Sequence, residues 1–308
     1  MSRRHAGTHH PAGVCRREPG DGAHHPVGVS RRHRGAAPRG PRLLGAAQVT
    51  ALACVAAVLV GGCGGGDSDD RTPRPARAGL AQERRGDLVY LRGGAGPGRV
   101  TVIRRADAAG RLPLVLFLHG WGATDPRTYR PWLEHLARAG NAVVYPRYQD
   151  SFAEPPPQVL GNAIAGLRTA LQGIDEDRGS LVVAGHSAGG ALAADYAAIA
   201  ARVRLPRARA VLSIFPGRGL RRVPFALPAI DPAGIPAGTT VRVLTGAADR
   251  VVDPADAAAI VRGALRANAS LEVIRSRGAA DHLAPQRATR ISRRVFWTRL
   301  DRLIARVR

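Results

Sequence analysis

Short apolar segments alternate with alanine-rich amphipathic segments from residue 88 to the C-terminus, and this alternation constrains the fold most strongly. Residues 112–118 form a continuous apolar run, as expected for a parallel strand buried on both faces. Strand–helix alternation predicts a three-layer α/β fold with a mostly parallel central sheet flanked by helices, formed by one domain over 88–308. We expect strands 88–91 and 100–103 to form an antiparallel pair at the start of the sheet. The other expected strands are 112–118, 142–145, 181–184, 208–214, 241–245 and 271–274. The expected helices are 129–138, 159–171, 190–201, 254–267 and 291–307.

The composition narrows the possible functions. Hydrophobic residues make up 45% of the 308 residues and charged residues 22%, which excludes disorder along the whole chain. Apolar runs do not recur, which excludes a protein with several membrane spans. The net charge is +23, but all 46 basic residues are arginine and they are spread along the sequence, whereas a nucleic-acid-binding face would cluster its charge. We therefore expect no nucleic-acid partner.

The N-terminal part has the layout of an export signal. Residues 1–42 are rich in arginine and histidine, and we expect them to be disordered or to precede the true translation start. An apolar stretch follows Arg39 and Arg42, as in a secretory signal. Residues 60–63, Val-Gly-Gly-Cys, resemble the lipobox of bacterial lipoproteins, which implies a signal peptide over 43–62 and lipid on Cys63. The competing interpretation is an uncleaved membrane helix, but Gln48 interrupts the run.

This resemblance implies a protein of the cell envelope, anchored by lipid on the outer face of the cytoplasmic membrane. Cysteine usage agrees, because Cys15 and Cys54 both precede the expected cut, so the exported domain has no disulfide. Residues 63–87 begin with the lipidated cysteine and continue with Gly, Asp, Arg and Pro. We expect them to form a flexible linker to the domain.

The motif that carries chemistry is Gly185-His186-Ser187-Ala188-Gly189, which fits G-x-S-x-G. The expected strand 181–184 comes directly before it and an alanine-rich helix directly after it, which is the setting of a nucleophile elbow. In such a turn, glycines leave room for a strained backbone that exposes the serine oxygen at a helix N-terminus. The competing interpretation is a plain glycine-rich turn. We favour Ser187 as a nucleophile.

A serine nucleophile needs a base, and the chain order expected after a nucleophile elbow is serine, acid, histidine. His282 is the only histidine after Ser187, so elimination assigns it as the base. Asp249, which follows the strand 241–245, is the expected acid. Asp253 is its rival, but a helix-capping role already explains that residue. Asp281 is adjacent to His282, and we interpret it as part of the loop structure.

The negative charge that develops during acyl transfer needs two N–H donors. The backbone N–H of Ala188, at the start of the helix after Ser187, is one candidate. The other is the backbone N–H of Trp121, in the loop His119-Gly120-Trp121-Gly122 that follows the long apolar strand. A plain strand-to-helix loop is the alternative interpretation of these glycines.

The order and setting of these motifs resemble an α/β-hydrolase of the bacterial esterase/lipase type, from about residue 112 to the C-terminus. The resemblance implies a serine hydrolase that cleaves carboxylic esters through an acyl-enzyme, without metal or cofactor. Serine at the elbow argues against relatives with aspartate there (dehalogenases) or cysteine there (dienelactone hydrolases). The alternatives are an acyltransferase or peptidase with the same triad, or a non-catalytic envelope lipoprotein that resembles a hydrolase.

Two further features concern the substrate, which we expect to be a small-molecule ester. An indole at Trp121 would offer a flat apolar wall. We expect His282 to occupy Asp249, so nothing obvious in the loops of the site selects a cationic substrate, and we expect neutral, moderately apolar esters. Their acyl groups should be short to medium or their leaving groups aryl. Residues 217–238 form either a lid or a proline-stiffened surface loop, and residues 148–159 are expected to line the cleft.

Overall fold

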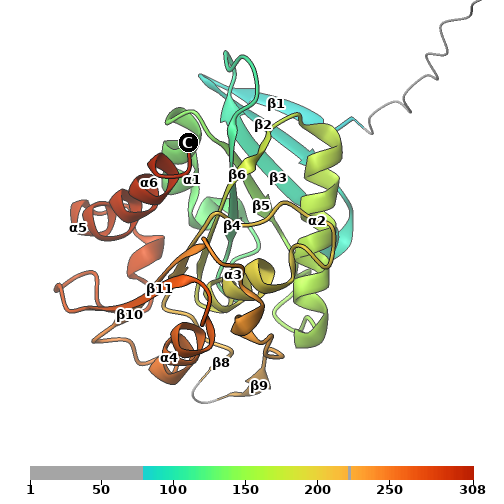
Figure 1. Cartoon of the computed structure of the whole chain (residues 1–308). Helices are drawn as coiled ribbons and strands as arrows, with labels where there is room; N and C mark the ends of the chain where they lie inside the picture. Colours follow the sequence, from blue (N-terminus) through green and yellow to red (C-terminus); the bar gives the residue numbers. More distant parts are fainter. Residues whose placement is uncertain (1–78, 221–222) are drawn as a thin grey trace, which may run out of the picture. The chain divides into compact units, whose positions relative to one another are not determined.

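A nine-stranded sheet forms the centre of the molecule (Figure 1). The structure is a computed structural model that describes residues 79–220 and 223–308, so the expected leader, signal peptide and lipidated Cys63 lie outside the described residues. The strand order is β1-β2-β3-β5-β4-β6-β7-β10-β11. The strands are β1 (Ala81–Arg85), β2 (Leu88–Gly93), β3 (Val100–Arg105), β4 (Pro113–Leu118), β5 (Ala142–Pro146), β6 (Asp177–His186), β7 (Ala210–Ile214), β10 (Thr240–Gly246) and β11 (Asn268–Ile274).

The sheet begins with antiparallel pairs and continues with parallel ones. β1 pairs with β2, β2 with β3, and β3 with β5 in antiparallel fashion. Every pair from β5 to β11 is parallel. The predicted α/β architecture, in which the sheet starts with antiparallel strands, is therefore confirmed. Because neighbouring parallel strands end at the same edge, the loops after β4, β6 and β10 come together there.

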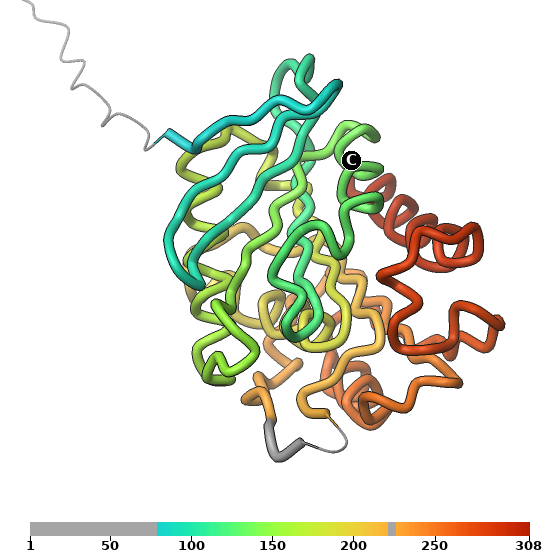
Figure 2. The backbone as a smooth tube through the Cα atoms, turned by 180° about the vertical axis from the view of Figure 1, so that it is seen from behind, coloured from blue at the N-terminus to red at the C-terminus, as the bar shows by residue number. Residues whose placement is uncertain are grey.

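Helices cover both faces of the sheet, as Figure 1 and the reverse view in Figure 2 show. Leu114, Leu116 and Leu118 of β4 belong to one hydrophobic core, and Val115 and Phe117 belong to the other. Successive side chains of a strand point to opposite faces, so a strand between two cores must be apolar throughout. The first core includes residues of α2 (Val159–Gly173), α3 (Ala188–Ile199) and α4 (Pro254–Gly263), and the second includes residues of α1 (Arg130–Arg138) and α6 (Thr298–Ala305).

Three details differ from the expectation drawn from sequence. β1 lies within the segment 63–87 that was expected to be a linker, because its mostly exposed polar residues join the sheet through backbone pairing with β2. The helix expected over 291–307 is divided into α5 (Arg290–Ser292), a π-helical turn (Arg293–Trp297) and α6. The segment 217–238 contains a small antiparallel hairpin of β8 (Gly219–Leu220) and β9 (Val223–Ala226).

Buried contacts fasten both ends of the segment 217–238. The guanidinium of Arg218 donates to both carboxylate oxygens of Asp195 on α3, at 2.9 and 2.6 Å, and its backbone N–H donates to Asp256 on α4 at 2.7 Å. Leu227 and Ile235 are buried in the core beside α3 and α4. These contacts fit the proline-stiffened loop better than a freely moving lid. Within residues 79–220 and 223–308, the structure contains no helix with the length and apolar character needed to span a membrane.

Candidate active site

Ser187 occupies a strained turn between β6 and α3. Its backbone has φ 58° and ψ −123°, a conformation that a residue with a side chain rarely adopts. The Ser187 N–H donates to the carbonyl of Ile214 on β7 at 2.9 Å, and its own carbonyl accepts from Gly190 N–H at 2.8 Å. These hydrogen bonds hold the turn, so Ser187 lies at the carboxyl end of β6 and at the N-terminus of α3.

The flanking glycines are required by close backbone approach. A Cβ atom on Gly185 would lie 2.0 Å from the carbonyl oxygen of Gly189, and a Cβ on Gly189 would lie 2.1 Å from the carbonyl oxygen of Leu118. Neither backbone atom can yield as a side chain would, so any larger residue would displace α3 from β4 and β6. Ser187 therefore lies in a tight strand-to-helix turn of the kind that the G-x-S-x-G pattern predicts.

The structure brings the three predicted catalytic residues into one hydrogen-bonded chain. His282 Nε2 lies 2.9 Å from Ser187 Oγ, and His282 Nδ1 lies 2.7 Å from Asp249 Oδ2. All three side chains are buried. An ionised carboxylate can only accept, so Nδ1 carries the ring hydrogen of a neutral His282, and Nε2 has a free lone pair to accept the serine proton.

Asp249 is held as an anion. Burial alone would raise its pKa, but the hydrogen bonds from His282 and from the N–H groups of Val251 and Val252 lower the pKa of Asp249 below its ordinary value. Those N–H groups lie 2.9 and 3.4 Å from Oδ1, which leaves Oδ2 directed at His282. The carboxylate is thus both charged and fixed in orientation.

The two rival acids have other roles. Asp253 accepts from the N–H of Ala255 at 2.9 Å and caps α4, as predicted. Asp281 accepts from the N–H of Leu283 at 3.2 Å and forms an ion pair with Arg287, which matches its interpretation as loop structure. Neither carboxylate has a hydrogen bond to His282 in the part of the chain that the structure describes.

The loop 119–122 lies directly beside Ser187. A Cβ atom on Gly120 would lie 3.4 Å from Ser187 Cβ, so the backbone of this loop faces the serine. Ala188 is the first residue of α3, and the N–H groups of a helix's first turn have no partner within the helix. Of the residues predicted to supply the two N–H donors, Ala188 follows Ser187 in the chain, and Trp121 follows Gly120, whose backbone lies beside Ser187.

Two residues without a role in the sequence-based prediction, His186 and Tyr129, connect the loop 119–122 with the loop that carries His282. His186 Nε2 lies 2.8 Å from the carbonyl oxygen of His282, so this nitrogen must carry the hydrogen, because a carbonyl only accepts. In the neutral ring Nδ1 then accepts from the hydroxyl of Tyr129 at 2.8 Å, and the Tyr129 oxygen accepts from the N–H of Gly120 at 3.1 Å. The hydrogen bonds run from the loop 119–122 to the backbone of His282.

His186 is kept neutral. Burial, and secondarily the proximity of His282, lower the pKa of His186 to about 3. The sequence signal for this role is weak, because Tyr129 and His186 are 57 residues apart and no spacing relates them. A polar residue inside an otherwise apolar strand end is the one hint that His186 has a buried partner.

The described residues contain no cluster of three or more His, Cys, Asp or Glu side chains that could hold a metal ion. The chemistry that this arrangement supports is proton transfer from Ser187 to His282, with Asp249 stabilising the imidazolium that forms.

Comparison with known proteins identifies the fold. A family model described as alpha/beta hydrolase fold matches residues 115–260, a span that contains Ser187 and Asp249 and ends before His282. No curated protein matches the sequence. Similar solved structures include a fungal esterase from Rhizomucor miehei, with 20% identity, a TM-score of 0.54, and coverage of 76% of this chain and 83% of that chain.

Two bacterial esterases are also similar. Esterase B from Lactobacillus rhamnosis, in a structure with a tributyrin phosphonate, shares 16% identity over 73% of this chain and 88% of its own, with a TM-score of 0.56. A thermostable esterase from Pseudomonas putida ECU1011 shares 19% identity over 76% of this chain and 86% of its own, with a TM-score of 0.55. At such identities the likeness concerns the fold alone. The strand order and these comparisons give the described chain the α/β-hydrolase fold.

The buried neutral His186 makes stability depend on pH. Unfolded, this histidine takes up a proton near pH 6.5, whereas in the folded protein its pKa is about 3. Between these values the unfolded state binds more protons, so the free energy of unfolding falls as pH falls, by up to about 1.4 kcal/mol per pH unit from this residue. Urea unfolding of the wild type and of His186→Gln between about pH 7 and pH 5 measures this contribution.

We expect His186→Gln to be less stable at neutral pH and to lose stability less steeply on acidification. Tyr129→Phe is the matched control, because it breaks the contact with His186 but keeps the buried histidine. Its free energy of unfolding should fall with decreasing pH as steeply as that of the wild type. An unchanged slope in His186→Gln would contradict the assignment of a neutral ring.

Proposed function

We propose that the protein is a serine hydrolase that cleaves carboxylic esters through an acyl-enzyme. The observation that carries this proposal is the hydrogen-bonded chain from Asp249 through His282 to Ser187 at the strained elbow. An unactivated serine is a poor nucleophile, and a base held in the correct tautomer by a buried carboxylate is the arrangement that activates it.

The proposed reaction has two halves. Ser187 Oγ attacks the ester carbonyl while its proton moves to His282 Nε2, and the carbonyl oxygen becomes an oxyanion next to the N–H groups of Ala188 and Trp121. The bond to the leaving alcohol breaks, and His282 returns the proton to that alcohol. Water then attacks the acyl-serine by the same route, which releases the acid and regenerates Ser187.

Ester hydrolysis is favoured over the alternatives by the comparisons. Three similar structures are named as esterases, and one of them is described with a tributyrin phosphonate. An acyltransferase or a peptidase would use the same triad but needs an acyl acceptor or a peptide-binding cleft. A non-catalytic envelope protein would have no need for a correctly oriented Asp249, His282 and Ser187.

The triad predicts a steep loss of activity on substitution. Ser187→Ala or His282→Ala should lower kcat for a neutral aryl ester by roughly three to six orders of magnitude, because triad members act as one unit. Asp249→Asn should lower kcat by about four orders of magnitude, since the amide favours the wrong histidine tautomer. Labelling by a fluorophosphonate probe should require Ser187.

Asp253→Ala is the matched control, because it removes a nearby carboxylate that caps α4 and does not contact His282. It should cost about 1 kcal/mol of stability and leave kcat nearly unchanged. Full activity in Ser187→Ala, or loss of activity in Asp253→Ala but not in Asp249→Ala, would overturn the proposal.

The side chain of Trp121 suggests the type of substrate. Its Nε1–H donates to the carbonyl of Phe152 at 3.0 Å, and the two rings meet edge to face with centroids 6.2 Å apart. Phe152 is 62% exposed, so an aromatic surface lies open next to the loop 119–122. We propose that this pair forms the wall for neutral, moderately apolar esters, because the acidic groups of the loops around the triad are engaged within the protein, Asp249 by His282 and Asp281 by Arg287.

Trp121→Ala keeps the backbone N–H but removes the wall, so it should raise KM for aryl and medium-chain esters and shift the acyl preference, while kcat falls by no more than about tenfold. Phe152→Ala should shift the preference in the same direction. Competition between neutral and charged esters of equal size provides the measurement. Preference for cationic esters, or for peptides over all esters, would contradict this proposal.

We also propose that the domain is exported and held at the membrane by lipid on Cys63, which rests on the sequence pattern alone. Two or more acyl chains anchor a protein stably, so the wild type should sediment with membranes. Cys63→Ala should leave an unprocessed or released form. Wild-type protein found in the cytosol, without lipid and beginning at Met1, would refute this location.

A further inference from the structure

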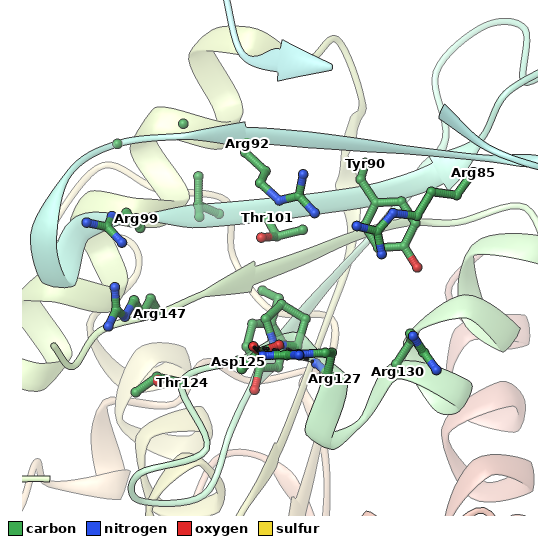
Figure 3. Close-up of a pocket in the computed structure, with 15 residues that line it drawn as sticks. Arg85, Tyr90, Arg92, Arg99, Thr101, Thr124, Asp125, Arg127, Arg130 and Arg147 are labelled. Atoms are coloured by element: carbon green, nitrogen blue, oxygen red, sulfur yellow. Dashed lines mark hydrogen bonds and ion pairs between the residues drawn. The ribbon is translucent and has the colours of Figure 1, made fainter. Parts of the chain in front are cut away.

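A cavity at the antiparallel end of the sheet is lined by arginine (Figure 3). Its volume is about 590 Å³, and none of the proposed catalytic residues lines it. Strands β1, β2, β3 and β5 and the residues next to them contribute one side, and the segment 124–130 contributes the other. Among the described residues that line it, Asp125 is the only carboxylate, and the arginines are Arg85, Arg92, Arg99, Arg127, Arg130 and Arg147.

Strand pairing places two of these arginines opposite each other. The N–H of Arg147 donates to the carbonyl of Arg99 at 2.8 Å, next to the registered pair Val100 and Pro146 of β3 and β5. Figure 3 shows both guanidinium groups at the same end of the cavity. Like charges directly opposite in a strand pair destabilise the pair unless an anion lies between them.

Carboxylates of the protein compensate these charges only in part. Arg99 has no ion pair with any residue in 79–220 or 223–308, and Arg147 is 3.4 Å from Asp150. Arg130 is 4.0 Å from Glu134, a carboxylate that Arg138 also contacts at 3.2 Å. The remaining pairs are Arg85 and Arg92 with Glu83, both at 2.5 Å, and Arg127 with Asp125 at 2.6 Å. The cavity therefore keeps an excess of positive charge.

We propose that this cavity binds a ligand that carries a phosphate group. A guanidinium presents paired N–H donors that match two oxygens of a phosphate, and Arg99 and Arg147 together can surround one. The hydroxyl groups of Thr101 and Thr124 line the same cavity as further donors. The volume is that of a small-molecule site and exceeds what one inorganic phosphate fills.

Two sources share this chemistry: a soluble phosphoester and the headgroup of an anionic phospholipid. They differ in whether the phosphate is reached from solution or at a membrane surface. The proposal is independent of ester hydrolysis, because the cavity shares no residue with the chain Ser187, His282 and Asp249.

The chain offers a matched control for non-specific attraction by arginine. A second hollow of about 600 Å³ is lined by Arg202, Arg207 and Arg266, with Asp231. It has fewer arginines, and Arg266 there is engaged with the carbonyl of Ala233 at 3.2 Å. Removing two charges from either hollow lowers the net charge equally, so only a specific site distinguishes the two double variants.

The experiment compares Arg99→Gln/Arg147→Gln with Arg202→Gln/Arg207→Gln in the full-length chain. Calorimetric titration with glycerol 1-phosphate, with glycerol as the uncharged reference, measures soluble binding. Sedimentation with phosphatidylcholine vesicles, with and without phosphatidylglycerol, measures headgroup binding of chains whose Cys63 is changed to serine. Thermal unfolding with and without glycerol 1-phosphate tests whether each variant is folded and responds to the ligand.

We expect the first double variant to bind at least about tenfold more weakly than the wild type, and the second to bind within about twofold of it. Without ligand, the first variant should unfold no lower than the wild type, because a like-charge contact is relieved. Ser187→Ala should bind as the wild type does, which separates this site from the proposed hydrolase.

Binding to phosphatidylglycerol vesicles alone would identify the headgroup as the source, and binding to glycerol 1-phosphate alone would identify a soluble ligand. Equal weakening by both double variants would show attraction by net charge and overturn the proposal. Absence of binding by the folded wild type in both assays would overturn it as well.

Discussion

The close approach of backbone at Gly185 and Gly189 is the constraint on which the candidate site depends. A Cβ atom at either position would lie only 2.0 or 2.1 Å from the facing carbonyl oxygen, so only hydrogen fits there. The contact places the N-terminus of α3 against the ends of β4 and β6, and all residues of α3 are buried as a result. A helix enclosed on every side favours small and apolar residues, which explains its alanine-rich sequence, and its one charged residue, Asp195, is paired with Arg218. The strain at Ser187 is maintained by the packing of this whole helix and not by local contacts alone.

The hydrogen bonds through Tyr129 and His186 hold the backbone on both sides of the triad in place. The triad fixes the ring of His282, whereas His186 fixes its backbone, at 2.8 Å from the carbonyl oxygen. At the other end of the same chain, Gly120 fixes the position of the loop that carries Trp121. The loops after β4 and β11 are far apart in sequence, and this buried polar chain links them directly. A neutral histidine is required, since a charged ring would offer a donor to Tyr129 where an acceptor is needed.

Sequence reasoning predicted the residues whose roles are local or unique. His282 followed from elimination, and Asp253 was separated from Asp249 because a helix cap explains it, which agrees with the contacts observed. β1 was not predicted, because Glu83 and its exposed neighbours carry no apolar pattern and join the sheet through backbone alone. The role of Tyr129 depends on a contact across 57 residues. The arginines looked evenly spread along the sequence, yet antiparallel register brings Arg99 and Arg147 together, and only strand pairing reveals that contact.

The arginine cavity and the candidate active site share one segment of the chain. Trp121 lies at the start of the segment 119–130, and Thr124, Asp125 and Arg127 lie further along it in the cavity wall. The Tyr145 hydroxyl donates to the carbonyl of Ala123 at 2.5 Å, and His119 Nε2 lies 2.6 Å from the carbonyl oxygen of Arg147. These bonds fasten the segment to β5 at the residues that line the cavity. The wall of the cavity and the loop that carries Trp121 are therefore parts of one segment that hydrogen bonds fasten to the end of β5.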